Sequence, residues 1–527
     1  MKIGLSLRPF DFRLAILVLG LAGPAFSAPA PLLHGSEVIL QPVFSPDASR
    51  LAFASTLPDL VTNDTNGRVL DVFLLDLASG RIELVSVRAD GTGSGDGPSY
   101  APQFAAAGTA VLFESRAENL VTNDANGRAD VFVRYLDSGR TLLLSTNRLG
   151  VGANGNSFQP RASADGRRVV FQSQATDLTS TIDLNGRDDL FLLDLDAGTT
   201  TIINTNRLRQ PATNGAAAPF ISADGAFVVF QSASADLVPA PASGYSTDLY
   251  QRRTDNGRID MLRAITNGPL HTVPALNPTM ASATNQLACI LNGSASWGTP
   301  VGTFRFDLAT GLELNHGIGS STNLTGFLIS TFAGPAMSAD GSVIAVEGLT
   351  GTGTTVRRSV FVWRPGLAVP QELTSDSLPT NSAYFLHSPV LAANGGRVAA
   401  LHSSGMLVVF NTDGTIAGGP FPADDWSAPA LSNDGRLIAF HTLLPNATGQ
   451  PATQALFLID LAAAVVRLDI RPVANGVEIS WTGGEGYILE SVDVLDGSWQ
   501  PVGAVGAGST VDLPATGGGK FFRLHKP

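Results

Sequence analysis

The chain of 527 residues contains a single cysteine, Cys289, so no disulfide bond can form within it. Cys289 lies in the apolar segment 287–291, where a buried, inert thiol is expected rather than a nucleophile. A large closed fold has enough hydrophobic core to be stable without disulfides, even outside the cytoplasm.

Recognisable catalytic motifs are also missing from the sequence. No Gly-x-Ser-x-Gly elbow occurs, and the seven histidines are dispersed, with no pair at metal-ligand spacing. The formal net charge is −12, which argues against a nucleic-acid partner. Beyond the N-terminus no segment is long and apolar enough to span a bilayer, so membrane insertion is not expected.

A basic start followed by a short apolar segment, 14–21, stands at the N-terminus, and Ala25 and Ser27 provide small residues for cleavage. This arrangement is typical of a secretory signal. We therefore predict that residues 1–27 are a signal peptide and that the mature protein starts near Ala28. The protein is then exported, to the periplasm, the extracellular space or the cell surface.

One unit recurs eight times along the chain: a small-residue turn, a short apolar strand, and a second apolar strand about twenty residues later. In the clearest unit, the turn at 163–166 precedes strands predicted at 169–173, 189–195 and 200–203. The eight turns fall at 45–47, 105–108, 163–166, 222–225, 282–285, 338–341, 392–395 and 432–435.

A repeat of this length requires a stacked or closed architecture. With the segment before each turn, every unit supplies four short strands, and four-stranded units around an axis are propeller blades. The sequence predicts an all-β fold, an eight-bladed β-propeller, with seven blades as the alternative if one weak unit is an insertion. The core is expected to include Phe73, Phe132, Phe171, Phe191 and Phe230.

The pattern Ser-Ala-Asp-Gly-x-x-Val-Val-Phe, followed by Asp-Leu-Phe-x-x-Asp-Leu-x-x-Gly at 189–198, resembles the TolB-type propeller repeat. The resemblance covers about residues 36–465 and lacks the Trp-Asp signature of WD repeats. It implies the fold more than the function, because that family includes periplasmic scaffold proteins and the propeller halves of some peptidases. The Asp-Gly pair is lost at 105–108 and 282–285, which concerns the geometry of those blades and not the architecture.

Residues 466–527 are predicted to form a separate small β-sandwich. Five short strands with turn signals between them are expected here, and Trp481, Tyr487 and Trp499 are expected in its core. The order of these motifs resembles the fibronectin type III or immunoglobulin-like terminal modules of secreted bacterial proteins.

Three loops in consecutive repeats carry an oxygen-rich pattern: an Asp, an Asn-Gly pair, and a second Asp where the next strand begins. Calcium binds such hard oxygen ligands, although the bidentate Glu of an EF-hand is missing. Because Asp and Asn also close turns by bonding to their own backbone, purely structural loops are the alternative. The candidate calcium ligands are Asp64, Asn66, Asp71, Asp124, Asn126, Asp130, Asp183, Asn185 and Asp189.

A polar residue recurs just after the central apolar residue of the first apolar strand. Such a ring either lines a central channel and binds a ligand, or is satisfied by hydrogen bonds between blades. Its members are Glu114, Gln172, Gln231, Glu347 and His441.

Three functions remain open at this point. The first is an exported, non-enzymatic propeller that acts as a binding or scaffold module for a protein or a glycan. The alternative is a secreted polysaccharide-active enzyme, a lyase or glycosidase, whose site lies on the propeller axis and leaves no linear motif. The third is a structural part of a cell-surface assembly.

Overall fold

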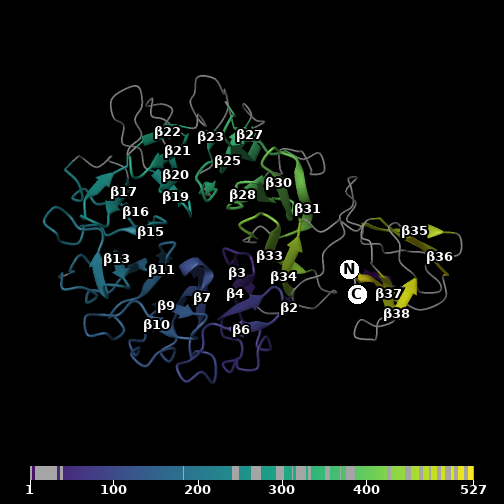
Figure 1. Cartoon of the computed structure of the whole chain (residues 1–527), viewed down its shortest axis with the longest axis horizontal. Helices are drawn as coiled ribbons and strands as arrows, with labels where there is room; N and C mark the ends of the chain where they lie inside the picture. Colours follow the sequence, from purple (N-terminus) through teal and green to yellow (C-terminus); the bar gives the residue numbers. More distant parts are fainter. Residues whose placement is uncertain are drawn as a thin grey trace.

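The repeats fold into antiparallel sheets, and eight such sheets surround a common axis (Figure 1). The computed structural model describes residues 3–5, 33–35, 39–181, 183–239, 248–262, 275–291, 302–310, 312–315, 328–329, 334–350, 357–367, 370–374, 386–423, 429–444, 453–461, 467–473, 476–482, 488–492, 500–503, 509–514 and 520–525. In this part of the chain the structure is all-β apart from one 3-10 turn, η1 (Ala106–Gly108). The protein is an eight-bladed β-propeller, so the seven-bladed alternative is wrong.

The blades, named A to H in chain order, contain four strands each, except blade F with five. Blade A consists of β3 (Ile39–Phe44), β4 (Arg50–Ser55), β5 (Asp71–Asp76) and β6 (Ile82–Leu84). Blade B consists of β7 (Ser99–Ala105), β8 (Ala110–Ser115), β9 (Asp130–Tyr135) and β10 (Thr141–Leu143). Blade C consists of β11 (Ser157–Ala162), β12 (Arg168–Ser173), β13 (Asp189–Asp194) and β14 (Thr199–Ile202). Blade D consists of β15 (Ala217–Ile221), β16 (Phe227–Ser232), β17 (Asp248–Arg253) and β18 (Ile259–Met261).

The second half of the ring follows the same order. Blade E consists of β19 (Ala275–Met280), β20 (Gln286–Leu291), β21 (Gly302–Asp307) and β22 (Leu312–Asn315). Blade F consists of β23 (Leu328–Ile329), β24 (Ala336–Met337), β25 (Ile344–Thr350), β26 (Arg357–Trp363) and β27 (Gln371–Glu372). Blade G consists of β28 (Leu386–Leu391), β29 (Arg397–His402), β30 (Met406–Asn411) and β31 (Ile416–Pro422). Blade H consists of β32 (Ala430–Leu431), β33 (Leu437–Leu444), β34 (Thr453–Asp460) and β2 (Leu33–Gly35).

The ring is closed by a strand from the other end of the chain. β2 pairs antiparallel with β34, with Leu33 opposite Leu456, and so provides the outermost strand of blade H. The innermost strands also form an unbroken circle of contacts, in the order β3, β7, β11, β15, β19, β24, β28, β32 and back to β3. Pairing the first strand with the last blade means that the blades cannot separate without breaking a sheet. β2 ends at Gly35, so this strand lies just before residue 36, where the sequence predicts that the propeller begins.

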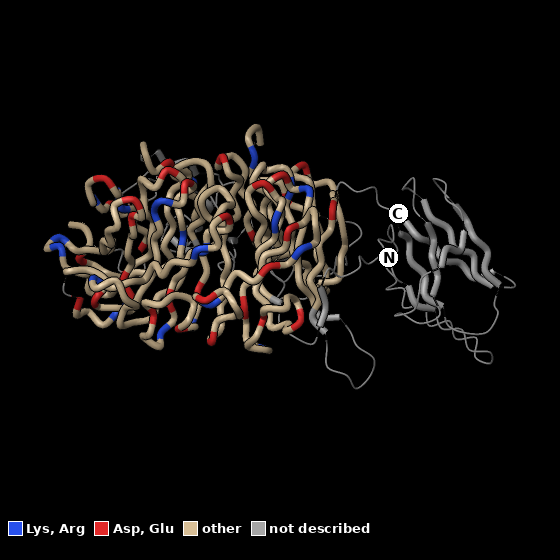
Figure 2. Tube along the Cα trace, turned by 60° about the horizontal axis from the view of Figure 1, so that its bottom comes forward, with Lys and Arg blue, Asp and Glu red and all other residues tan. Residues whose placement is uncertain are grey.

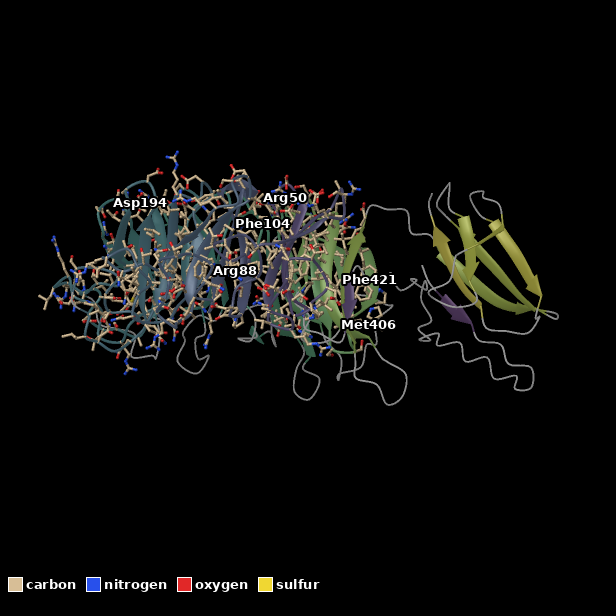
Figure 3. All side chains as sticks on the ribbon, turned by 90° about the horizontal axis from the view of Figure 1, so that it is seen from below. Arg50, Arg88, Phe104, Asp194, Met406 and Phe421 are labelled. Carbon is tan, nitrogen blue, oxygen red and sulfur yellow. The ribbon has the colours of Figure 1, made fainter. Side chains whose placement is uncertain are left out.

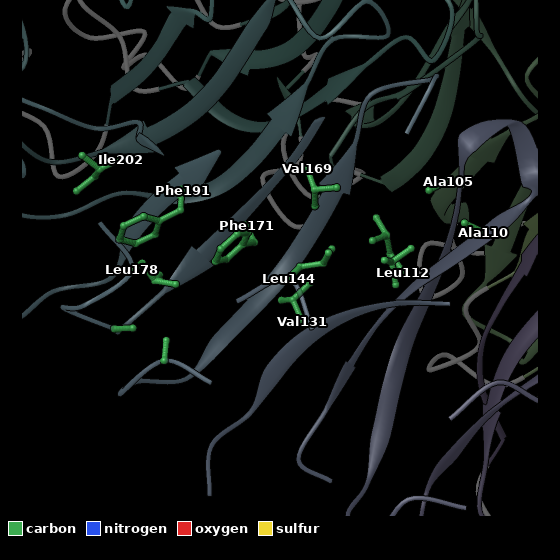
Figure 4. Close-up of a cluster of buried hydrophobic side chains, with 13 residues drawn as sticks. Ala105, Ala110, Leu112, Val131, Leu144, Val169, Phe171, Leu178, Phe191 and Ile202 are labelled. Atoms are coloured by element: carbon green, nitrogen blue, oxygen red, sulfur yellow. The ribbon is translucent and has the colours of Figure 1, made fainter. Parts of the chain in front are cut away.

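Aromatic pairs between the second and third strands build the blade cores. The predicted core residues Phe73, Phe132, Phe171, Phe191 and Phe230 are all at most 2% exposed, which confirms the prediction. The rings stack with centroids 5.3–6.0 Å apart in the pairs Phe53–Phe73, Phe113–Phe132, Phe171–Phe191, Phe230–Tyr250 and Phe440–Phe457. Figure 4 shows Phe171 and Phe191 in the cluster that joins blades B and C. In blade E, Cys289 follows Phe230 by 59 residues, takes the equivalent strand position and is buried, as predicted.

Five of the innermost strands contain the same bulge. Its residue adopts a left-handed backbone, with φ between 49° and 54°, and a proline follows it directly in the sequence. Pairing with the second strand shifts register at this point, where the missing N–H of proline costs no ladder bond. The left-handed residues are Gln41, Ala101, Gln159, Ala218 and Ser388.

The two ends of the blades form two rims with different chemistry. The turns from first to second and from third to fourth strands form the turn rim. The loops from second to third strands and the connections between blades form the loop rim. Figure 3 shows Arg50 and Asp194 near the turn rim, with Met406 toward the loop rim. In Figure 2, acidic and basic residues are interspersed over the coloured part of the propeller.

Five turns of the turn rim share one hydrogen-bond pattern. A serine hydroxyl donates to the aspartate two residues later at 2.5–2.6 Å. A backbone N–H two residues after the aspartate donates to the same oxygen at 2.9–3.1 Å. The serine bond is the main reason why the pKa values of Asp47, Asp165 and Asp434 lie below their usual range. The five pairs are Ser45–Asp47, Ser163–Asp165, Ser222–Asp224, Ser338–Asp340 and Ser432–Asp434.

The turns also link neighbouring blades. The N–H of Ala164 donates to the Ala223 carbonyl at 2.9 Å, and the N–H of Ala339 donates to the Ala393 carbonyl at 2.7 Å. Across the junction of blades H and A, the Asn433 side chain donates to the Pro46 carbonyl at 2.7 Å. The turn motif therefore fixes both the hairpin and the packing of the next blade.

The turns at 105–108 and 282–285, which lack Asp-Gly, keep their blades. At 105–108 the chain forms η1, with Ala106 and Ala107 in left-handed conformations. At 282–285, Asn285 instead donates to Asp224 of the preceding blade at 2.9 Å. Blades B and E retain four strands, so the loss of the motif changes the turn and not the architecture.

The strands predicted after residue 466 are present. β36 (Gly476–Thr482) pairs with β35 (Arg467–Val473) and β39 (Ser509–Pro514). β37 (Ile488–Val492) pairs with β38 (Gln500–Gly503) and β40 (Lys520–His525), and β1 (Ile3–Leu5) pairs with β40. The separate sandwich, its core residues Trp481, Tyr487 and Trp499, and its fibronectin-like or immunoglobulin-like identity stay predictions. The signal peptide falls almost entirely outside the described residues and also stays a prediction.

Candidate functional sites

The first candidate site is the oxygen-rich loop of blade A, between β4 and β5. Asp71 begins β5, is fully buried, and accepts a 2.6 Å hydrogen bond from the Ser86 hydroxyl through Oδ1. Burial is the main cause that raises the pKa of Asp71 to about 7, and the nearby Asp64 charge raises it further. Asp64 accepts a 3.2 Å bond from Ser94. The structure thus brings Asp64, Asn66 and Asp71 together in one loop.

Ser94 and the following residue hold this loop against the connection to blade B. The Ser94 hydroxyl accepts hydrogen bonds from the N–H groups of Thr65 and Asn66, each at 3.0 Å. The Asn66 side-chain amide donates to the Gly95 carbonyl at 2.7 Å. The loop is therefore pinned by its backbone and by one amide, while its carboxylates face each other.

Blade B repeats the arrangement with one change. The Asn126 amide donates to Asp130 Oδ2 at 2.7 Å and to the Ala153 carbonyl at 2.8 Å. The Asn126 carbonyl oxygen accepts the N–H of Arg128 at 2.8 Å. Both oxygens of Asp130 are engaged, because Ser145 donates to Oδ1. Burial, and then the Asp130 charge, raises the pKa of Asp124 to about 6.

Blade C completes the series. The Asn185 amide donates to Asp189 Oδ2 at 2.8 Å, and the Asn204 amide donates to Asp189 Oδ1. Burial is the main cause that raises the pKa of Asp189 to about 7, and a hydrogen-bonding contact with Asp183 raises it further. In all three blades, then, two buried or half-buried carboxylates lie side by side.

Sequence reasoning missed the partner of the strand-entry aspartates. In all three blades this partner lies fifteen residues after the aspartate. Ser86 follows Asp71, Ser145 follows Asp130, and Asn204 follows Asp189. The same side chains accept the N–H of the residue after each aspartate, at 2.8–3.1 Å. The fixed spacing was visible in the sequence, but a polar residue there has no meaning until β6, β10 and β14 are known to end beside β5, β9 and β13.

Within the described residues, no group of three or more His, Cys, Asp and Glu side chains is arranged to hold a metal ion. Each loop brings two carboxylates together rather than three. A cation at these loops would therefore need amide or backbone oxygens and water to complete its coordination.

The second candidate site is a pocket of about 530 Å³ on the inner strands of blades A, B and C. Left-handed bulge residues of all three blades line it. Its hydrogen-bonding side chains come from neutral amides, a phenol, two guanidinium groups and one carboxylate. These are Gln41, Gln103, Asn156, Gln159, Tyr100, Arg116, Arg161 and Glu114.

Glu114 connects the pocket to the bulges. Its carboxylate accepts the N–H of Gln159, the bulge residue of blade C, at 2.9 Å. Burial raises the pKa of Glu114, and the Arg161 charge partly offsets this effect. Arg161 lies over the Phe220 ring of blade D, 5.7 Å from its centroid. The pocket wall is thus fixed by contacts that cross two blade junctions.

Two members of the predicted polar ring, Glu114 and Glu347, link neighbouring blades. Glu347 repeats the role of Glu114 and accepts the N–H of Ser388, the bulge residue of blade G, at 3.3 Å. Gln172 donates to Asp188 within its own blade at 2.8 Å. Of the two predicted alternatives, hydrogen bonding between blades describes Glu114 and Glu347, and Glu114 also lines the pocket.

No protein-family model and no curated protein matches the chain. Solved structures that resemble it include β-propellers. A prolyl endopeptidase shares 11% identity with a TM-score of 0.45 over 86% of this chain, which spans only 55% of that chain. An oligogalacturonate lyase from Vibrio parahaemolyticus shares 12% identity with a TM-score of 0.43, covering 82% of this chain and 92% of that one. TolB from Acinetobacter baumannii shares 16% identity with a TM-score of 0.30, covering 67% and 76%.

The described part of the chain contains no helix with the length and apolarity needed to cross a membrane.

Proposed function

We propose that the protein is an exported, non-enzymatic β-propeller that binds a glycan or protein partner through the axial pocket of blades A to C. The observation that carries this proposal is the convergence of side-chain amides, Tyr100 and Arg116 on one pocket of about 530 Å³. Amide, hydroxyl and guanidinium groups recognise the hydroxyls of sugars and the backbone of peptides. The volume of the pocket falls in the range of small-ligand sites.

The carboxylate in the pocket supports binding rather than catalysis. A general acid must reach the substrate within hydrogen-bond distance. Glu114 is buried and already accepts the Gln159 N–H at 2.9 Å. Its role in this arrangement is to fix the pocket wall. Nucleic acids and insertion into a bilayer are not part of the proposal.

Binding of the purified full chain to an array of bacterial and plant oligosaccharides tests this function. A variant carrying Gln103→Ala and Arg116→Ala should lose the binding, while Arg187→Ala, on an exposed loop of blade C, should retain it. Binding that survives the double substitution would place the site elsewhere. Shortening of a bound polysaccharide by the wild-type chain would favour the alternative, a lyase or glycosidase on the axis.

Export is tested separately. N-terminal sequencing of the protein from its native host should find a start near Ala28. A chain that retains Met1 in the cytoplasm would contradict this part of the proposal.

A further inference from the structure

Two loops of the loop rim contain buried oxygen atoms without a hydrogen-bond donor. In blade A these are Asp71 Oδ2 and Asn66 Oδ1, and in blade B the atom is Asp124 Oδ1. Asp71 is 0% exposed and Asp124 is 6% exposed. Buried carboxylate oxygens almost always have a partner, because a desolvated charge without one is costly. An unpaired oxygen at this depth calls for a proton, a water molecule or a cation.

Hydrogen bonds from the Ser86 and Asn66 side chains lower the pKa of Asp71, but no positively charged side chain acts on Asp71 or Asp124. Apart from hydrogen bonds, the charges that act on Asp71 and Asp124 come from other carboxylates, Asp64 in blade A and chiefly Asp130 in blade B. Like charges gathered in a buried loop repel each other unless a proton or a cation lies between them.

We propose that the blade A loop binds a divalent cation and that the blade B loop is a second, weaker site. The ligands are all oxygen atoms, which indicates calcium. Asp71 Oδ2, Asn66 Oδ1 and the half-buried Asp64 carboxylate supply the ligands in blade A. In blade B only Asp124 Oδ1 is uncommitted, because Asn126 and Asp130 already bond to each other. Water completes both shells, which fits the flexible coordination of calcium better than the strict octahedron of magnesium.

Blade C provides an internal comparison. Asn185 and Asn204 occupy both oxygens of Asp189. Asp183 contacts Asp189 as a hydrogen-bonding neighbour. Both oxygens of Asp189 therefore have hydrogen-bond donors within the chain. The third loop therefore keeps its predicted ligands Asp183, Asn185 and Asp189 together without needing a metal ion.

Calorimetric titration of the chelator-treated full chain with calcium chloride tests the proposal. The wild type should bind with a Kd on the order of 0.1–1 mM, the range of extracellular calcium modules completed by water, and its thermal midpoint should rise in millimolar calcium. Asp71→Asn should remove the tighter site and Asp124→Asn the weaker one. Asp189→Asn, at the equivalent position of blade C, should leave binding unchanged.

Folding is checked in chelator by circular dichroism and thermal unfolding. If Asp71→Asn does not fold, Asp64→Asn changes a half-buried ligand of the same site and should weaken binding in its place. Equal midpoints in calcium and chelator, with no heat of binding, would overturn the proposal. So would calcium binding that Asp71→Asn and Asp64→Asn leave intact. Equal stabilisation by magnesium chloride would overturn the assignment of calcium.

Discussion

The turn rim and the loop rim both depend on aspartate, but they hold it in opposite states. On the turn rim, Asp165 is largely exposed, is bonded by a serine and by a backbone N–H, and has a lowered pKa. On the loop rim, Asp71 and Asp189 are fully buried, and burial raises the pKa of each to about 7. Hydrogen-bond donors next to an exposed carboxylate favour its ionised form, whereas burial of a carboxylate without a counter-charge favours its neutral form.

The difference shows that one residue type, repeated at one period, serves two purposes. The turn-rim aspartates close hairpins and need nothing beyond the chain. The loop-rim aspartates that begin the third strands bond to a residue just after the fourth strand of the same blade. In blades A and B, loop-rim aspartates also retain unpaired oxygens. The first rim is complete by itself, while the second calls for a proton or a cation.

The largest expected effect comes from the core that both rims share. Phe171→Ala should destabilise the fold by about 3–5 kcal/mol, because the side chain is fully buried and stacked on Phe191. Chemical denaturation measures this loss. Leu184→Ala, at a loop position 87% exposed, is the control and should change little. A small effect of Phe171→Ala would mean that the rims, and not the blade cores, hold the ring together.

Glycine substitutions should separate the rims next. Gly166 has a φ of +72°, and a Cβ there would lie 2.7 Å from Ala106 Cβ of the neighbouring blade. Gly186, on the loop rim, has a φ of +63° but open space around it. Gly166→Ala should cost roughly 2–4 kcal/mol from backbone strain plus overlap, and Gly186→Ala about 1–2 kcal/mol from strain alone. Equal costs in thermal unfolding would contradict the blade contact at the turn rim.

Neutralising one aspartate on each rim should give opposite signs. Asp165→Asn removes a charge that accepts two hydrogen bonds, at a cost of about 0.5–1 kcal/mol after screening at the surface. Asp71→Asn, measured in chelator, removes a buried and uncompensated charge and should leave stability unchanged or higher. Urea unfolding of both variants decides the matter. A loss at Asp71 as large as that at Asp165 would mean that Asp71 is already paired.

The last comparison of the two rims is a difference in pH dependence. The folded protein binds the proton of Asp189 more tightly than the unfolded chain does. The corresponding stability is full below the ordinary value of 3.8 and is lost as the pH rises to about 7. The turn-rim carboxylates act in reverse, since their stabilisation is lost as the pH falls through their lowered pKa values. In chelator, Asp189→Asn should reduce the loss between pH 4 and pH 7, to which Asp71 and Asp124 also contribute, and should leave the acid limb unchanged. An unaltered slope in thermal unfolding would show that the Asp189 proton is not the source.

Much of the propeller could be read from the sequence because a blade is a local structure. The turn at 163–166, the β-branched strand after it, and the Phe171–Phe191 pair all lie within one repeat, and local hydrogen bonds and alternation of buried residues determine them. The three loops could be found for the same reason, since Asp64, Asn66 and Asp71 lie within eight residues of one another.

Only the tertiary structure decided how the repeats meet. Closure pairs Leu33 with Leu456, and the Glu114 bond to the Gln159 bulge crosses between blades. Neither contact has a sequence signal, because each depends on which blade edges face each other once the ring has closed. The sequence by itself determined the blade and its charged residues. The packing of blade on blade decided which of those charges are buried and which are left without a partner.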